Sequence, residues 1–236
     1  MRVEAQPSPL RALALALIAG LAACGGGAES NHPPPVGASA ETPTHTGSSS
    51  NVAAGSTQTA QALLASELRF SGELEARLRP APGGAKLLDA EGNELARYHL
   101  REDGSVRVRD AADVALGRVK GASDKLKVTG PEGEPLLGIY QLQSDGDWKY
   151  EDANESLLLR VGVREYGHKI EDANDELLGK TRERGSRVVF EDAGGVERFA
   201  TEDALSTAAL ACLAFEELSI PLRVGLLLRV HHDHGE

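Results

Sequence analysis

From residue 85 onward, apolar and charged positions alternate in short runs that recur about every twenty residues. Each run ends at a turn-forming residue, and these residues follow one another at intervals of 20 to 22 positions: Asp89, Asp110, Gly130, Asp152, Asp172 and Asp192. The side chains two positions earlier are apolar: Leu87, Val108, Val128, Tyr150, Ile170 and Phe190. The residue just before each of these is Lys or Arg in five of the six runs. Because neighbouring side chains of a strand point to opposite faces, each run predicts a half-buried β-strand.

A second apolar segment follows each turn and predicts the partner strand of a β-hairpin. The turns contain Asp, Asn, Gly and Pro, which accept left-handed or locally hydrogen-bonded backbone. Six residues after the turn residue the repeats carry Leu95, Leu116, Leu136, Leu158 and Leu178, and Arg198 in the last one. Apolar residues then occupy both parities, as in Leu158 and Leu159. The pattern therefore does not decide which side chains of the second strand point inward. A β-bulge would allow apolar residues at both odd and even positions to do so.

The chain after the last repeat follows a different pattern, which predicts a buried helix over residues 202–218. No charged residue occurs from Leu205 to Phe215. Thr201 is the expected N-cap, with Glu202 and Asp203 in the first turn. A helix that is apolar on every side must be enclosed, and this one is too short to cross a bilayer. Residues 222–230 form a further apolar segment that fits either a helix or a strand.

Six hairpins and one apolar helix together predict an antiparallel barrel of about twelve strands around a hydrophobic C-terminal helix. A barrel larger than eight strands has room for an enclosed helix. This arrangement, over residues 85–218, resembles the tubby-like and phospholipid-scramblase-like fold. The chain departs from that family because it lacks a basic cluster for phosphoinositide headgroups, so headgroup binding is not carried over. The alternative is a β-solenoid with one repeat per rung and a capping helix.

The start of the chain has the pattern of a bacterial export signal that ends at a cysteine. Arg2 and Arg11 precede a charge-free run over residues 12–23, which is too short to span a membrane. Leu21-Ala22-Ala23-Cys24 resembles the lipobox of bacterial lipoproteins. The resemblance implies cleavage before Cys24, acyl chains such as palmitate on that cysteine, and attachment to a membrane. Gly25 stands where the family's inner-membrane retention signal is usually Asp, which favours the outer membrane.

Composition divides the rest of the chain into a tether and a folded part. Residues 25–60 contain no Leu, Ile, Phe, Tyr or Trp, so they cannot bury a core and predict a disordered tether. The predicted organisation is a signal peptide over 1–23, a lipidated cysteine and a tether rich in Gly, Ser, Thr and Pro over 24–60, a lead-in segment over 61–84 and a β-repeat domain over 85–236. The lead-in segment fits either a short helix or a strand.

Charge and cysteine content limit the function classes. The net charge is −11 and no basic block occurs, which disfavours nucleic acid as a partner. If Cys24 is acylated, Cys212 has no partner, and no disulfide within the chain is expected. The common hydrolase, nucleotide and zinc signatures are absent, so we expect neither a catalytic residue nor a cofactor.

Few residues remain as candidates for metal or acid-base chemistry. His231, His232 and His234 in the C-terminal tail are weak metal candidates. His168 stands at an inward strand position, which favours a hydrogen-bonded core histidine. The leading hypothesis is a non-catalytic structural or protein-interaction module of the cell envelope. The alternative is a binder of a small apolar ligand or lipid inside the barrel, and an enzyme comes third.

Overall fold

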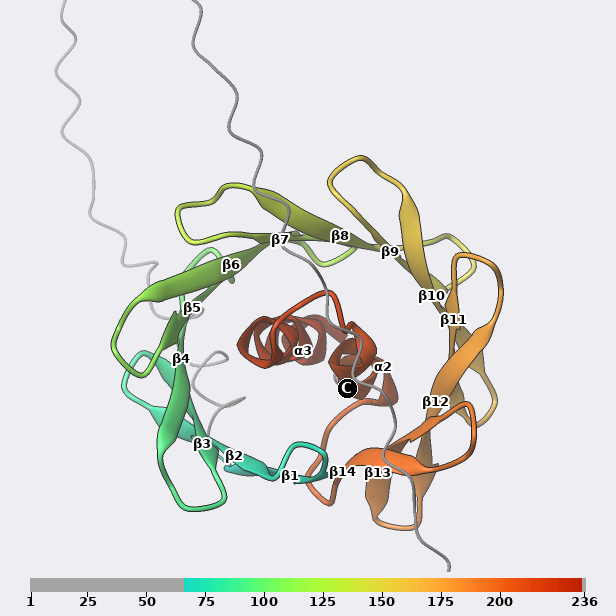
Figure 1. Cartoon of the computed structure of the whole chain (residues 1–236), viewed down its shortest axis with the longest axis horizontal. Coiled ribbons are helices and arrows are strands. Elements are labelled where there is room, and N and C mark those ends of the chain that lie inside the picture. Colours follow the sequence, from blue (N-terminus) through green and yellow to red (C-terminus); the bar gives the residue numbers. More distant parts are fainter. Residues whose placement is uncertain (1–65, 235–236) are drawn as a thin grey trace, which may run out of the picture. The chain divides into compact units, whose positions relative to one another are not determined.

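The computed structural model describes residues 66–234, and their fourteen strands form one closed antiparallel barrel (Figure 1). Each strand pairs with its neighbours in chain order, and β1 pairs with β14 to close the sheet, with Ser71 opposite Ala200. The strands are β1 (Leu68–Gly72), β2 (Ala76–Ala81), β3 (Gly84–Asp89), β4 (Glu94–Leu100), β5 (Val106–Asp110), β6 (Ala115–Ala122), β7 (Lys125–Thr129), β8 (Leu136–Leu142), β9 (Trp148–Glu151), β10 (Leu157–Arg164), β11 (Gly167–Asp172), β12 (Leu177–Arg184), β13 (Arg187–Asp192) and β14 (Glu197–Thr201). The helical segments are α2 (Thr207–Ala211), the 3₁₀ helix η1 (Cys212–Ala214) and α3 (Ile220–His234).

The six predicted repeats are the six hairpins from β3–β4 to β13–β14. Their inward residues form the core, and Leu87, Val108, Val128, Tyr150 and Ile170 are fully buried. The cationic residues between them lie on the outer face, where they reach water. The expected barrel of antiparallel hairpins around apolar helices is confirmed, and the solenoid is excluded because the strands close into a single ring.

The lead-in segment supplies two strands that the repeat pattern did not predict. β1 and β2 form a seventh hairpin, which lies between β3 and β14 and pairs with both. Its inward side chains Leu68, Phe70 and Leu78 are at most 5% exposed. The barrel therefore has fourteen strands rather than about twelve. The extra hairpin covers the two open edges that the repeats alone would leave.

The helix predicted over residues 202–218 is wrong in its limits. Thr201 ends β14, and the N-cap is Ser206, whose Oγ accepts a hydrogen bond of 3.2 Å from the backbone N–H of Ala209. The helical turns of α2 and η1 stop at Ala214. Glu216 and Glu217 are exposed at the barrel end, because two carboxylates could not continue a helix through an apolar interior.

The apolar segment that the sequence left open is the long helix α3. Pro221 lies in its first turn, where a missing backbone N–H costs no helical hydrogen bond. Every residue from Val224 to Val230 is buried. Gly225 lets the helix approach β5, since a Cβ atom there would lie 2.9 Å from Cγ2 of Val108. Figure 1 shows α2 and α3 inside the ring of strands. None of the helices in the described part of the chain is long and apolar enough to cross a membrane.

Candidate functional site

One end of the barrel carries a regular ring of bulge residues. In β10, Leu159 lies opposite Tyr150 and Leu157 lies opposite Glu151, so Leu158 has no partner on β9. The same irregularity recurs once in each repeat, and its unpaired residues are Leu95, Leu116, Leu137, Leu158, Leu178 and Arg198. A β-bulge re-aims a side chain, and here Leu95 and Leu178 are exposed, whereas Leu116, Leu137 and Leu158 are half-buried against the core. The bulges explain why apolar residues occupy consecutive positions in the second strands.

The third repeat differs from the predicted leucine position by one residue. Its bulge residue is Leu137 rather than Leu136. The turn that precedes it is longer, because the N–H of Gly130 bonds to the carbonyl of Pro135, five residues on. In the first repeat the N–H of Asp89 reaches only the carbonyl of Asn93.

Glycine follows the bulge leucine in three repeats, and the structure shows why. A Cβ atom at Gly138 would lie 2.5 Å from ring carbons of Tyr150, and one at Gly179 would lie 2.6 Å from the ring of Phe190. The ring of Tyr150 stacks on Phe215 at a centroid distance of 4.8 Å and has little room to retreat. In these two repeats the glycine leaves room for an inward aromatic ring, whereas a Cβ atom at Gly117 would lie 2.4 Å from the carbonyl oxygen of Thr129 and 2.8 Å from Cδ2 of Leu222.

The turns at this same end are acidic. We call it the turn end, because the turns after β3, β5, β7, β9, β11 and β13 all lie there. These six turns, residues 89–93, 110–114, 130–135, 152–156, 172–176 and 192–196, contain twelve carboxylates and neither Lys nor Arg. The turn aspartates are structural, since Oδ1 of Asp172 accepts 2.9 Å from the N–H of Glu176. That backbone hydrogen bond lowers the pKa of Asp172.

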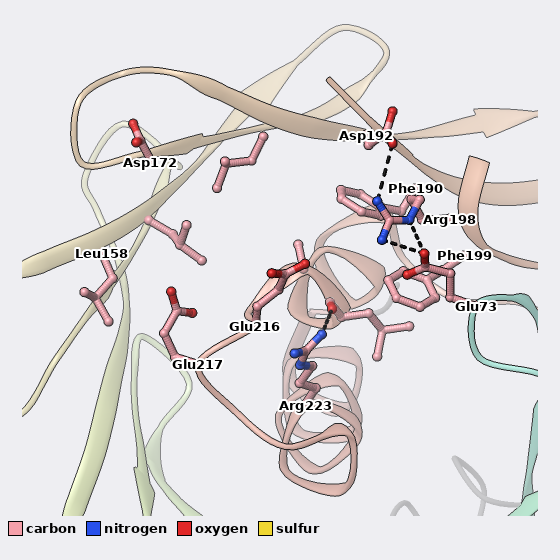
Figure 2. A pocket seen from close by; sticks show the side chains of 14 residues that line it. Glu73, Leu158, Asp172, Phe190, Asp192, Arg198, Phe199, Glu216, Glu217 and Arg223 are labelled. Carbon is pink, nitrogen blue, oxygen red and sulfur yellow. Dashed lines mark hydrogen bonds and ion pairs between the residues drawn. The ribbon is translucent and has the colours of Figure 1, made fainter. Parts of the chain in front are cut away.

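A cavity of about 310 Å³ opens at the turn end, between the strands β10–β14 and the segment that joins η1 to α3 (Figure 2). Its lining combines apolar side chains with charged ones: Glu73, Leu158, Leu159, Asp172, Leu178, Phe190, Asp192, Arg198, Phe199, Leu213, Ala214, Glu216, Glu217 and Arg223. The rings of Phe190 and Phe199 stack with centroids 5.8 Å apart. We refer to this hollow as the end cavity.

Arg198 occupies the sixth bulge, where the other repeats carry leucine. Its guanidinium donates to Oε1 of Glu73 at 2.5 Å and lies 3.4 Å from Oδ2 of Asp192. The hydrogen bond to Glu73 raises the pKa of Arg198. Glu73 belongs to the β1–β2 turn, and its own N–H donates to the carbonyl of Arg198 at 2.7 Å. Arg198 thus fastens the closing hairpin to the last repeat.

The second arginine of the end cavity is bound to backbone oxygens. Arg223 donates to the carbonyls of Leu218 and Leu213, at 2.7 and 2.9 Å, and its burial lowers its pKa. Glu216 and Glu217 form no ion pair with any described residue, and Figure 2 shows both among the side chains that line the cavity. Five carboxylates against two guanidinium groups leave the lining with three unbalanced negative charges.

The residues singled out from the sequence lie elsewhere. Cys24 falls outside the described residues, as do residues 1–23 and 25–60, for which a signal peptide and a tether are predicted. His231, His232 and His234 lie on the last turn of α3, at the opposite end of the barrel, where Nε2 of His234 contacts the carbonyl of Ser123 at 2.9 Å. No group of three His, Cys, Asp or Glu side chains suited to a metal ion occurs within residues 66–234.

Of two further residues predicted to be internal, His168 is half-buried and Cys212 is fully buried. Nδ1 of His168 lies 3.0 Å from Oγ1 of Thr207 in α2, and burial lowers the pKa of this histidine. Cys212 is fully buried in η1, and burial raises the pKa of its thiol. A thiol held protonated in the core is a poor nucleophile.

A basic side face also forms, which the sequence had not indicated. Lys120 and Lys127 stand directly opposite each other on β6 and β7, and both line an outer hollow with Arg118, Lys125 and the carboxylates Asp103 and Asp124. These cations meet because alternate positions of paired strands lie side by side in space although they are separate in sequence.

Sequence reasoning missed the end cavity itself. Glu73 was outside the repeats, and Glu216 and Glu217 were assigned to the helix. One signal was present, since Arg198 broke the run of leucines at the position where the cavity opens. The lining contains carboxylates and guanidinium groups but no hydroxyl, thiol or imidazole, so it holds neither a Ser-His nor a Cys-His pair.

Comparison with known proteins leaves the family open. No protein-family model matches the chain, and no curated protein matches it. Among solved structures, an X-ray structure of a protein from Arabidopsis thaliana is similar over 62% of this chain and 86% of its own, with a TM-score of 0.36 and 12% identity. Alternansucrase in complex with isomaltononaose is similar over 54% of this chain, with a TM-score of 0.17 and 16% identity, and the match spans 13% of that enzyme.

Proposed function

We propose that this chain is a bacterial envelope lipoprotein with acyl chains on Cys24. The support is the order of residues 1–24, in which basic residues, a charge-free run and small residues lead to the cysteine. An acidic protein is repelled by anionic headgroups, so its membrane attachment needs an anchor other than charge. Two or more acyl chains supply such an anchor. Gly25 favours the outer membrane over the inner one.

Replacing Cys24 with Ala should therefore release the protein from the membrane. We expect a soluble or uncleaved precursor in place of the mature membrane-bound form, because the acyl chains would have no attachment point. Fractionation of cells and intact-mass measurement of the product check this. A Cys24→Ala protein that remains mature and membrane-bound would rule out the lipoprotein assignment.

We further propose that the barrel is a non-catalytic module that binds a protein partner through its turn end. The observation that carries this proposal is the arrangement of bulge leucines beside carboxylates that have no ion-pair partner. Leu95 and Leu178 are 39% and 37% exposed, although both are large apolar residues. Exposed apolar groups that are rimmed by polar ones are typical of protein interaction sites.

A photo-reactive amino acid at position 178 tests this interaction in cells. We expect a discrete adduct with one protein when the probe replaces Leu178, because that side chain lies in the predicted contact. The matched control is a probe in place of Tyr166, which is 45% exposed but lies in the β10–β11 turn at the opposite end. Adducts of equal yield from both positions would contradict a turn-end interface.

Binding of a small apolar ligand or lipid remains the second candidate. The end cavity, at about 310 Å³, lies at the small end of the range of ligand pockets. The centre of the barrel is occupied by α2 and α3, whose inward residues are fully buried. An internal ligand would have to displace α3, whereas a partner at the rim would displace only water.

A distant relation to the tubby-like fold also stays a proposal. It is supported by a closed antiparallel barrel that encloses apolar helices. Fourteen strands instead of twelve and a second enclosed helical segment depart from that pattern.

A further inference from the structure

We propose that the partner presents a basic amphipathic segment to the turn end, and that one of its Lys or Arg side chains enters the end cavity. This inference rests on the proposed protein-binding function and names the chemistry of the partner. Leucine-like side chains of the same segment would pack on the neighbouring bulge leucines.

One wall of the end cavity is apolar. Leu158 and Leu178 are neighbouring members of the bulge ring, and both line the cavity beside the stacked rings of Phe190 and Phe199. Such a wall suits the aliphatic stem of Lys or Arg, which packs along apolar surface while its charged head reaches polar groups. A further exposed apolar position on the turn end is Leu95, the bulge residue of the first repeat.

Two carboxylates that line the cavity favour a cationic occupant. Arg198 already forms ion pairs with Glu73 and Asp192, and both donors of Arg223 that reach protein atoms point to backbone carbonyls. Glu216 and Glu217 form no ion pair among residues 66–234, and the charge of each acts on Arg223 only at longer range, where it favours the charged guanidinium. An incoming ammonium or guanidinium group would pair with these two carboxylates. The turn carboxylates would attract a basic segment from a distance, since only Asp113, Asp175 and Asp192 among the twelve form ion pairs with described residues.

The volume of the cavity favours a single side chain over larger occupants. A cavity of about 310 Å³ accepts one long side chain more readily than a lipid or a large ligand. An anionic lipid headgroup would be repelled by the same carboxylates. The described residues also offer no metal-ligand cluster here. A cationic side chain carried by a polypeptide fits the apolar wall, the carboxylates and the small volume of the cavity.

Titration of the full-length Cys24→Ala chain with a short synthetic peptide of alternating Leu and Lys tests the proposal. We expect binding that weakens as salt is raised, and no binding of the matched peptide in which Glu replaces Lys. The double substitution Glu216→Gln, Glu217→Gln should weaken binding of the Leu/Lys peptide about tenfold, which corresponds to about 1.4 kcal/mol. Calorimetry or fluorescence anisotropy gives these affinities.

The matched control removes the same charge from the opposite end of the barrel. Glu165 and Glu183 are exposed, form no ion pair with described residues and lie in or beside turns at that end. The substitutions Glu165→Gln, Glu183→Gln should change the affinity by less than about twofold. Equal losses in the two double variants would mean that only net charge matters, and they would overturn the proposal. The thermal melts of both variants show whether the fold is retained.

Other results discriminate among the explanations. If hexylammonium alone binds as tightly as the peptide, the site takes a small cationic amphiphile and the polypeptide proposal is wrong. If the peptide does not bind while the probe at position 178 still forms its adduct, this inference fails and the protein-binding function stands. If the peptide binds but no adduct forms in cells, the site has the proposed chemistry and the proposed function is wrong.

Discussion

The substitution Leu210→Asp should abolish folding of the barrel. Leu210 lies in α2 and is fully buried, and α2 packs against β11–β13 and α3. The new carboxylate would be enclosed by apolar side chains without a cationic partner. An uncompensated buried charge costs several kcal/mol, against a total stability of roughly 5–15 kcal/mol for a typical domain. Circular dichroism and thermal melts of the purified Cys24→Ala chain measure this loss.

The control for this experiment places the same carboxylate where water reaches it. Val114 is 58% exposed in the turn after β5, so Val114→Asp should change the free energy of unfolding by less than about 0.5 kcal/mol. A Leu210→Asp protein that keeps its β signal and a cooperative melt would show that α2 is not enclosed. The central position of the helices would then be wrong.

Deleting residues 66–83 should prevent the repeats from forming a soluble barrel. This deletion removes β1 and β2, and with them the buried side chains Leu68, Phe70, Leu74 and Leu78. Each buried side chain of this size contributes about 1.5–3 kcal/mol. The deletion also leaves β3 and β14 without their partners, and unpaired strand edges promote aggregation. Size-exclusion chromatography and circular dichroism of the truncated chain check the expected aggregation or unfolding.

A deletion of residues 25–60 is the matched control, because it removes more residues but none of the described strands. The melt of that variant should match the parent chain. A stable, monomeric protein after deletion of 66–83 would mean that the six repeats close without the seventh hairpin. In that case the pairing of β1 with β14 would not be needed for stability.

The repeats could be predicted because each hairpin is encoded locally. Alternation around Lys86, Arg107 or Lys127 depends only on the period of a strand, and the turn aspartates act through hydrogen bonds to residues four positions away. The position of Arg198 at the break in the leucine pattern was also visible. These features lie within single repeats, so one sequence is enough to read them.

The end cavity could not be predicted, because its walls come from segments far apart in the chain. Glu73 meets Arg198 across 125 positions, and no local periodicity reports such a contact. The sequence pattern placed Glu216 and Glu217 in an apolar helix. Only the end of the barrel determines where that helix stops. The same holds for Lys120 and Lys127, which face each other only because β6 and β7 pair.

The sequence by itself determined the β class, the six hairpins, the inward residues of their first strands and an apolar C-terminal element that had to be enclosed. These follow from side-chain periodicity and turn chemistry, which act over a few residues. Only the tertiary structure decided the number of strands, the division of the C-terminal segment into α2, η1 and α3, and the site at the turn end. Closure of a barrel requires that both edge strands find partners, and that condition depends on the whole ring rather than on any one repeat.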